Sequence, residues 1–366
     1  MPRFVQIGDL HLGRHLYGHR LLDDQRHALD QVLACIERNA PDALLITGDV
    51  YDRSVPPSDA VDLLDDFLHQ VIRELGVRTV MIPGNHDSAE RLGFGGRLFE
   101  GLHVARPFSG PVSPIPIAGC AVYPLPYLDP ARTRAKLERS DLRSHQEVTQ
   151  AVLEDLAPHD GPRVLLAHTW VSGGADSESE RALTIGGVQT VDVEVFADFD
   201  YVAVGHLHRP QQLEQVVYAG SLLPYSASEI GHDKSIAVVD IAADGALTVT
   251  REPISPLRAL RRISGTMDAL LSQPPSDDYL IVELTDEGPV YEAMRRLRTR
   301  FPHCVHIERP ALAQASSSSA PDVHQRSLEP HELFARFFEE VTGSALTDQD
   351  LARLHSFVDS AQEATP

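Results

Sequence analysis

The sequence predicts an α/β protein in which two β-sheets pack together in one large domain, followed by a small α+β domain and a helical C-terminal tail. Strand-like and helix-like patterns alternate through the first part of the chain, which is typical of a sheet covered by helices. Short glycine-bearing connections then join further strands, and the pattern changes near Pro256. The 366 residues exceed the usual size of a single domain.

The N-terminal part has the order strand, helix, strand, helix, strand. Apolar and β-branched runs indicate the strands, and apolar residues at helical spacing indicate the helices. The expected strands are residues 4–7, 43–47 and 77–82, and the expected helices are residues 20–38 and 58–75. Ser58 is expected to cap the second helix at its N-terminus. This alternation predicts a parallel sheet covered on both faces.

Further strands complete the large domain, which is expected to span residues 1–255. These strands are expected at residues 121–123, 164–167, 201–204, 216–219 and 235–241. Short connections with few helices between them predict a second sheet that is more antiparallel than the first.

The small domain is expected at residues 256–310. It contains an alternating strand at residues 279–284 and an arginine-rich helix at residues 291–300. Four successive serines then lie within residues 311–327, a tract whose composition favours a flexible linker.

The tail at residues 328–366 carries two helical patterns with a large apolar load for so short a segment. The apolar residues are Leu333, Phe334, Phe337, Phe338, Val341, Leu346, Leu351, Leu354, Phe357 and Val358. Two interpretations are open: the tail packs against its own domain, or it presents an apolar stripe to a groove on a partner protein.

Composition limits the class of protein. Hydrophobic residues make up 42% and charged residues 23%, as in ordinary globular proteins. No apolar run approaches membrane-spanning length, and Cys35, Cys120 and Cys304 form no motif of a disulfide framework or thiolate zinc site, so a reducing cytoplasm is expected. The net charge of −21 argues against nucleic-acid binding unless basic residues cluster or bound metal neutralises carboxylates.

Five polar clusters each follow a predicted strand. They are Asp9-Leu10-His11, Gly48-Asp49-Val50-Tyr51-Asp52, Gly84-Asn85-His86-Asp87, His168, and Gly205-His206-Leu207-His208. Each cluster alone is weak evidence, because a tight turn or a structural histidine would look the same. Strand ends at one edge of a sheet would, however, bring all five into one crevice.

These clusters supply oxygen and imidazole donors without cysteine, which suits divalent ions such as Mn²⁺ better than a structural zinc site. The candidate ligands are Asp9, His11, Asp49, Asn85, His168, His206 and His208. Seven donors exceed the need of one ion with an open position but suit two ions that share a carboxylate. Such pairs of ions serve displacement at phosphorus.

The five clusters in this order resemble the motifs of the calcineurin-like metallophosphoesterase superfamily. Longer stretches, including IGDLHLGR at 7–14, GNHDSAERL at 84–92 and YVAVGHLHRPQ at 201–211, are similar to its DNA double-strand-break repair branch, the bacterial SbcD nuclease subunits. This resemblance implies a two-sheet αββα sandwich, a small capping domain and a C-terminal tail that binds a partner.

The resemblance also implies a role for each site residue. Asp9, His11, Asp49 and His208 would hold one metal ion, and Asp49, Asn85, His168 and His206 the other. His86 would be the catalytic histidine that binds no metal, with Asp87 orienting its imidazole. We expect Asp52 to be a loop or helix-capping carboxylate rather than a ligand.

The activity implied by the resemblance is hydrolysis of DNA, as a 3′ to 5′ double-strand exonuclease and a single-strand or hairpin endonuclease. The implied cofactors are two ions, Mn²⁺ or alternatively Mg²⁺. The implied partners are the ATPase SbcC and a second copy of the chain, paired through helices near residues 58–75 or 88–100, within a heterotetramer acting in the cytoplasm at the nucleoid. A small-molecule phosphodiesterase and a non-catalytic scaffold of the same fold are the alternatives.

Two arginine-rich segments bear on the DNA-binding hypothesis. They are residues 132–143 and residues 295–300. Contact with DNA phosphates and a solvated helix face explain both segments equally well, so neither is assigned to DNA.

Overall fold

The structure is a computed structural model, and it describes residues 1–157, 159–178, 180, 190–242, 244–309, 347, 350 and 351. The chain divides into two compact units, Met1–Glu283 with Val290–Ile307, and Leu284–Pro289 with Glu308–Pro366. The predicted linker lies outside the described residues, and so do both predicted tail helices apart from three positions. The following paragraphs concern the first unit and the strands that end at its borders.

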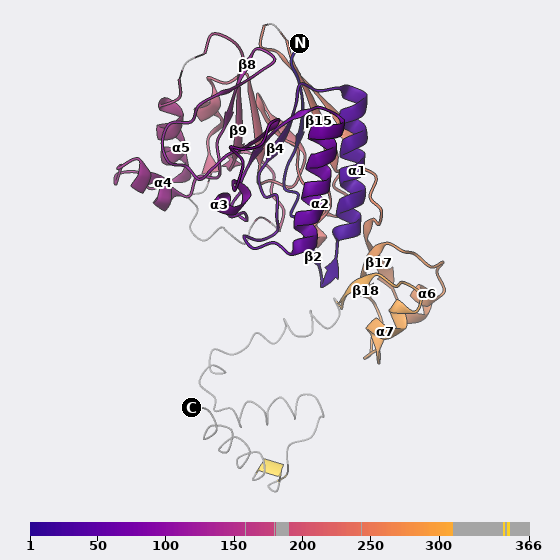
Figure 1. Ribbon diagram of the computed structural model, residues 1–366. Helices are drawn as coiled ribbons and strands as arrows, with labels where there is room; N and C mark the ends of the chain where they lie inside the picture. The colour runs from indigo at the N-terminus through magenta and orange to yellow at the C-terminus, as the bar shows by residue number, and fades with distance from the viewer. Residues whose placement is uncertain are drawn as a thin grey trace. The chain divides into compact units, whose positions relative to one another are not determined.

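The first sheet has six strands in the order β16-β15-β1-β4-β5-β6 (Figure 1). Their bounds are β1 Arg3–Ile7, β4 Ala43–Thr47, β5 Arg78–Ile82, β6 Leu102–Val104, β15 Ser235–Ile241 and β16 Leu247–Pro253. Strands β1, β4, β5 and β6 are parallel, whereas β15 pairs antiparallel with both β1 and β16. The predicted parallel N-terminal strands are confirmed, and the strand at 235–241 joins this sheet.

The second sheet also has six strands, in the order β13-β14-β12-β9-β8-β7. Their bounds are β7 Ile115–Ile117, β8 Cys120–Pro124, β9 Arg163–His168, β12 Tyr201–Gly205, β13 Gln211–Leu213 and β14 Val216–Tyr218. Only the edge strands β7 and β13 pair antiparallel; β8, β9, β12 and β14 are parallel. The prediction of a more antiparallel sheet is therefore wrong. Two unpredicted helices between β8 and β9 supply the crossover that a parallel pair needs.

Helices cover the outer faces of both sheets. They are α1 Leu22–Asn39, α2 Ser58–His69 with a π-helical continuation Gln70–Glu74, α3 Ala89–Leu92, α4 Pro130–Lys136 and α5 His145–Glu154. The first two helices were predicted. The assignment of Ser58 as the N-cap is wrong, because Pro57 occupies that position in an extended conformation and no side chain caps the helix.

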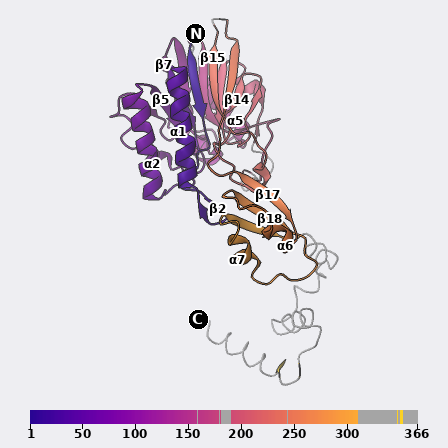
Figure 2. The ribbon, with the colours of Figure 1, turned by 90° about the vertical axis from the view of Figure 1, so that its right-hand side faces the viewer.

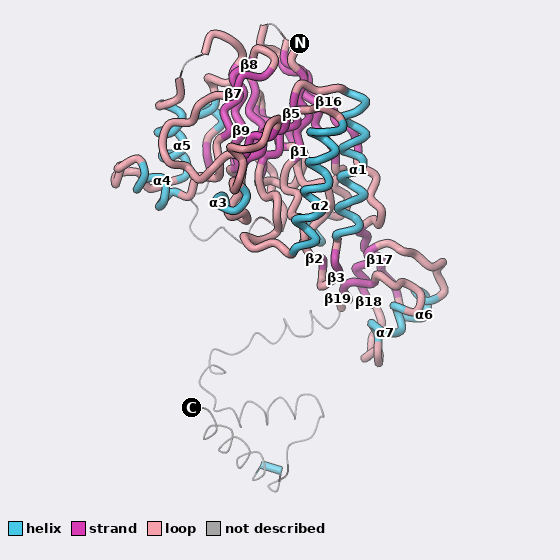
Figure 3. The backbone as a smooth tube through the Cα atoms, viewed as in Figure 1, coloured by secondary structure: helices cyan, strands magenta, loops and turns pink. Residues whose placement is uncertain are grey.

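The strands lie between two helical layers: Figure 2 shows α1 and α2 on one side of them and α5 on the other, and Figure 3 shows the strands gathered between the helices. Alternate residues of a strand face opposite layers. In β4, Leu44 and Ile46 pack with α1 and α2, whereas Leu45 packs with Val164 and Tyr201 of the second sheet. The predicted two-sheet αββα sandwich is thus confirmed.

A three-stranded sheet follows the sandwich in sequence. It consists of β17 Leu260–Gly265, β18 Tyr279–Leu284 and β19 Cys304–Glu308, with the helices α6 Met267–Leu271 and α7 Ala293–Arg298. The predicted strand at 279–284 is confirmed, and the predicted arginine-rich helix is present but shorter.

Short elements complete the description: β2 His15–Leu16, β3 His19–Arg20, β10 Trp170–Val171, β11 Thr190–Val191 and the 3-10 turns Val193–Phe196 and Ala227–Glu229. Within the described part of the chain, every helix is too short or too polar to cross a membrane.

Candidate metal centre

The carboxyl ends of β1, β4, β5, β9 and β12 lie close together, and each is followed or closed by one of the predicted polar clusters. Parallel pairing explains the arrangement, because it brings the same end of every strand to one edge. Tyr201–Gly205 pairs in register with β9, so that Gly205 lies opposite His168. The five clusters that were separate in sequence therefore meet at one site.

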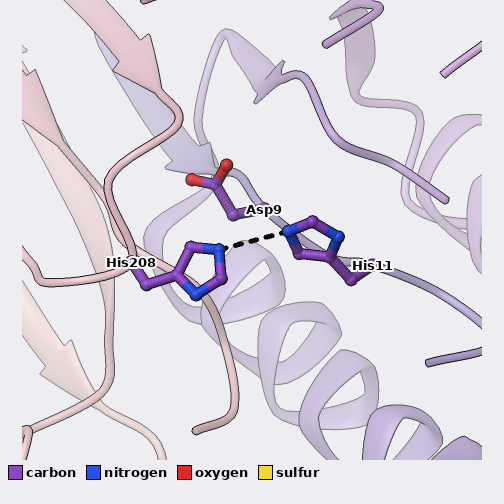
Figure 4. Close-up of side chains that lie close together, drawn as sticks. All are labelled: Asp9, His11 and His208. Carbon is purple, nitrogen blue, oxygen red and sulfur yellow. Dashed lines mark hydrogen bonds between the residues drawn. The ribbon is translucent and has the colours of Figure 1, made fainter. Parts of the chain in front are cut away.

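Asp9, His11 and His208 form one group of donors, whose ligand atoms lie within 4.8 Å of one another. Figure 4 shows the rings of His11 and His208 facing each other beside Asp9, with their Nε2 atoms 3.2 Å apart. The Oδ1 atom of Asp9 accepts from the backbone N–H of His206, whereas its buried Oδ2 atom has no hydrogen-bond partner. A buried carboxylate oxygen left unsatisfied beside two imidazole nitrogens is the environment that a cation stabilises.

Asp49, His168 and His206 form a second group with the same 4.8 Å limit. The side-chain oxygen of Asn85 joins it, lying 3.0 Å from His168 Nε2 and 3.2 Å from His206 Nδ1. The Nδ1 atom of His168 lies 2.8 Å from the Thr47 carbonyl oxygen. Because a carbonyl only accepts, this contact fixes the proton on Nδ1 and leaves Nε2 directed into the group.

Asp49 links the two groups. Its Oδ2 atom lies 3.4 Å from His168 Nε2 in one group and 3.7 Å from His11 Nε2 in the other. Its Oδ1 atom accepts from the backbone N–H of His86 at 2.9 Å, which holds the carboxylate in place. This geometry is that of a carboxylate shared by two ions.

Four of the candidate ligands have a left-handed backbone, with φ of 50° at Asp9, 43° at His11, 44° at Asp49 and 103° at His206. Residues with a Cβ avoid this region, and such conformations cluster at functional sites where the surrounding fold enforces them. The strained turns direct successive side chains of each cluster toward the same crevice.

Gly84 and Gly205 allow the loops to approach closely. A Cβ on Gly84 would lie 2.2 Å from Asp49 Oδ1, and one on Gly205 would lie 2.0 Å from the Thr47 carbonyl oxygen. Both glycines are therefore required by contact with the neighbouring strand end. At Gly84 the reason is space around Asp49.

His86 lies beside these groups without joining either. Its ring is in edge contact with that of His11, with centroids 4.8 Å apart, and its Nδ1 atom lies 2.9 Å from the backbone carbonyl oxygen of Asp52. The prediction that Asp87 orients the His86 imidazole is wrong in its geometry. The Asp87 carboxylate instead accepts from the backbone N–H groups of Val50, Tyr51 and Gly84. It ties the second loop to the third, while the Asp52 carbonyl takes the ring nitrogen.

Asp52 is an ion-pair residue. Its Oδ1 atom lies 3.2 Å from Arg14 Nη1, and the Arg14 guanidinium lies over the ring of Tyr225. The same oxygen is 3.8 Å from His11 Nδ1. The predicted capping role is therefore wrong, and the exclusion of Asp52 from the two ligand groups agrees with the geometry.

Burial and mutual charge shift the pKa values within the site. Burial raises the pKa of Asp9 to about 7 and lowers that of His206 to about 3. Burial also acts to raise the pKa of Asp49, but His168 outweighs it and holds that pKa well below its usual range. Burial opposes the charged form of His168, yet Asp49 raises its pKa to about 9. Without metal, a proton on His168 thus compensates the Asp49 carboxylate.

The donors fit divalent metal ions. Carboxylate, amide and imidazole donors without thiolate suit borderline or hard cations, and the two donor groups that meet at Asp49 match a site for a pair of ions. The three cysteines are buried elsewhere as free thiols.

Sequence reasoning missed the residues that surround His208. Glu229 and Lys234 are buried beside it, and the Glu180 carboxylate accepts from its backbone N–H. The sequence offers no local signal for them, since an acid and a lysine near glycine and serine look like surface residues.

The comparisons with known proteins agree with this site. The calcineurin-like phosphoesterase family matches residues 2–210, and the type 5 capsule protein repressor C-terminal domain matches residues 256–342. The chain belongs to the calcineurin-like phosphoesterase family and is a metal-dependent phosphodiesterase.

Within this family the chain groups with SbcD, one of the two components of the nuclease SbcCD. It is 30% identical to that protein of Staphylococcus epidermidis over 97% of this chain and 96% of the relative. The family resemblance predicted from the sequence motifs is therefore confirmed.

Two solved structures are also similar. The protein TT1561 of Thermus thermophilus has 13% identity and a TM-score of 0.38 over 68% of this chain and 98% of its own. A dimetal phosphatase from Danio rerio has 13% identity and a TM-score of 0.37 over 65% of this chain and 92% of its own.

Proposed function

We propose that the chain hydrolyses phosphodiester bonds of DNA with two divalent cations, most readily Mn²⁺, with Mg²⁺ as the alternative. The observation that carries this proposal is the pair of donor groups joined by Asp49, with His86 beside them. Asp9, His11, Asp49 and His208 would hold one cation, and Asp49, Asn85, His168 and His206 the other. When bound, the pair would supply an activated water and neutralise phosphate oxygens.

His86 is the proposed general acid. Its Nδ1 atom faces a carbonyl oxygen, which can only accept, so Nδ1 keeps its proton in every charge state. The proton that the ring gives and takes is therefore on Nε2. Protonated at Nε2, His86 would stabilise charge that develops on phosphate or protonate the leaving 3′-oxygen.

Asp87 supports the catalytic loop through its backbone. Its carboxylate holds Gly84 at one end of the loop and Val50 and Tyr51 next to Asp49, so it fixes the position of His86 relative to the shared ligand. We propose a positioning role for Asp87.

DNA is the proposed substrate because the relative is named as a nuclease and because a further domain of the same group follows the phosphoesterase domain. We extend the proposal to a 3′ to 5′ exonuclease and a hairpin or single-strand endonuclease that acts with the ATPase SbcC, bound through residues 328–366, in cytoplasmic DNA repair. Deletion of residues 328–366 should abolish ATPase binding and leave hydrolysis of a small phosphodiester intact.

A second copy of the chain is the other proposed partner, within a heterotetramer. Three large apolar side chains near α3 are exposed: Phe94 and Leu98 at 85% and Phe99 at 54%. Together with apolar residues of α2 such as Leu68, Leu98 and Phe99 line a groove. An exposed apolar patch of this kind supports a protein contact. A Leu98→Lys variant should sediment as a monomer while the unchanged chain sediments as a dimer.

The net charge of −21 favours one competing function, a phosphodiesterase for small molecules, because a polyanion such as DNA is repelled by an acidic protein. The deciding experiment compares linear duplex DNA with nucleotide phosphodiesters and monoesters in Mn²⁺. Cleavage of duplex DNA that EDTA abolishes would support the nuclease. Turnover of small esters alone would support the competitor, and no turnover of either would support a scaffold.

A further inference from the structure

Glu229 is a buried carboxylate that the proposed reaction does not use. It is 1% exposed, at the end of the turn Ala227–Glu229, and its Oε1 atom lies 3.1 Å from His208 Nδ1. The same oxygen accepts from the backbone N–H of Tyr225 at 3.2 Å. A carboxylate at this depth persists only when its charge is compensated.

Lys234 supplies that compensation. Its Nζ atom lies 2.6 Å from Glu229 Oε2, 2.7 Å from Ser221 Oγ and 3.0 Å from the backbone carbonyl oxygen of His208. An ammonium has three donors, and these contacts use all three. Its backbone is fixed as well, because the Lys234 carbonyl accepts from the N–H of Ile254. The ion pair therefore grips both the backbone and the ring of His208.

This arrangement determines which nitrogen of His208 carries the proton. Glu229 accepts from Nδ1, so the neutral ring has its lone pair on Nε2. That atom faces Asp9 and His11. The other imidazole of the group differs, because the buried Nδ1 atom of His11 has no hydrogen-bond partner.

We propose that Glu229, charge-paired with Lys234, is a positioning residue that fixes the tautomer and direction of His208 and thereby sets the cation affinity of the Asp9–His11–His208 group. Outer contacts of this kind change metal affinity by about 10–100-fold. The proposal rests on the two-cation centre proposed above.

Three variants separate this role from simple folding. In Glu229→Gln the amide has one acceptor oxygen for two donors, so either His208 or Lys234 meets an NH₂ group. In Glu229→Gln with Lys234→Met the ammonium is gone, and the amide oxygen is free to face His208. Asp24→Asn is the matched control, since Asp24 is also a buried acid paired with an arginine, Arg258, and touches no candidate ligand.

The experiment titrates metal-free protein with Mn²⁺ by calorimetry and reads the His208 tautomer from ring ¹⁵N shifts, with circular dichroism to verify folding. We expect wild type and Asp24→Asn to bind two ions. Glu229→Gln should bind one ion unchanged and the other about 10–100-fold more weakly, with a mixed tautomer. The double variant should recover the Nδ1–H tautomer and part of the affinity, even if Glu229→Gln fails to fold.

Two results would overturn this inference: two ions bound by Glu229→Gln as tightly as by wild type, or an unchanged tautomer in both variants. If wild type itself binds fewer than two ions, the two-cation proposal fails instead, so the two failures are distinguishable.

Discussion

The two halves of the candidate centre use the same imidazole ligands but orient them differently. His208 is held at Nδ1 by the buried Glu229 carboxylate, which is paired with Lys234. His168 is held at Nδ1 by the backbone carbonyl of Thr47. A backbone carbonyl belongs to the sheet and cannot be removed by substitution, whereas a buried ion pair depends on two side chains. The half with His208 is therefore the one that point substitutions can weaken without changing a ligand.

Asp49→Ala should have the largest effect because Asp49 faces both halves. We expect both bound ions to be lost, with affinity at each position reduced by more than about 100-fold, beyond the usual effect of an outer contact. Calorimetric titration with Mn²⁺ checks the stoichiometry. Retention of one tight ion would show that Asp49 belongs to a single half.

Single ligand substitutions should separate the halves. His208→Ala should abolish binding at the half with Asp9 and leave the other ion bound, and His168→Ala should do the reverse, because each ring lies in one group only. Electron paramagnetic resonance of Mn²⁺ distinguishes a coupled pair from a single ion. Loss of both ions in both variants would mean that the halves do not bind independently.

Protons should compete with cations differently in the two halves. In the metal-free protein Asp9 keeps its proton up to pH about 7 and His168 up to pH about 9. Binding must release these protons, so cation affinity should rise with pH and level off near 7 in the first half and near 9 in the second. Titrations of His208→Ala and His168→Ala across this range give the two profiles. Affinity independent of pH would contradict both assignments.

His86→Gln should have the smallest effect on binding, since His86 belongs to neither half linked by Asp49. Both ions should bind as in wild type, while DNA cleavage falls by about 10²–10⁴-fold through loss of the general acid. A cleavage assay on linear duplex DNA with matched metal loading measures this. Full activity in this variant would remove His86 from the mechanism.

The sequence predicted the ligands well because each lies directly after a strand. A strand pattern followed by Asp-x-His or Gly-Asn-His is a local signal, and parallel pairing then converts it into a position in space. The same local reading failed for the second sheet, where α4 and α5 interrupt the strands without a strong apolar period, and for Ser58, where Pro57 takes the cap position.

Contacts between distant segments could not be predicted in this way. The Asp52 carbonyl reaches His86 across 34 positions, and Glu229 reaches His208 across 21. Which acceptor a ring nitrogen meets depends on loop conformation, not on residue type. Asp87 illustrates this, because it is adjacent to His86 in sequence yet directs its carboxylate to backbone N–H groups.

The central claim is that two cations share Asp49. Anomalous diffraction from crystals of the His86→Gln protein grown with Mn²⁺ tests it most directly. We predict two peaks, one in contact with Asp9, His11 and His208, the other with Asn85, His168 and His206, and both in contact with Asp49. A single peak, or two peaks of which only one touches Asp49, would contradict the account.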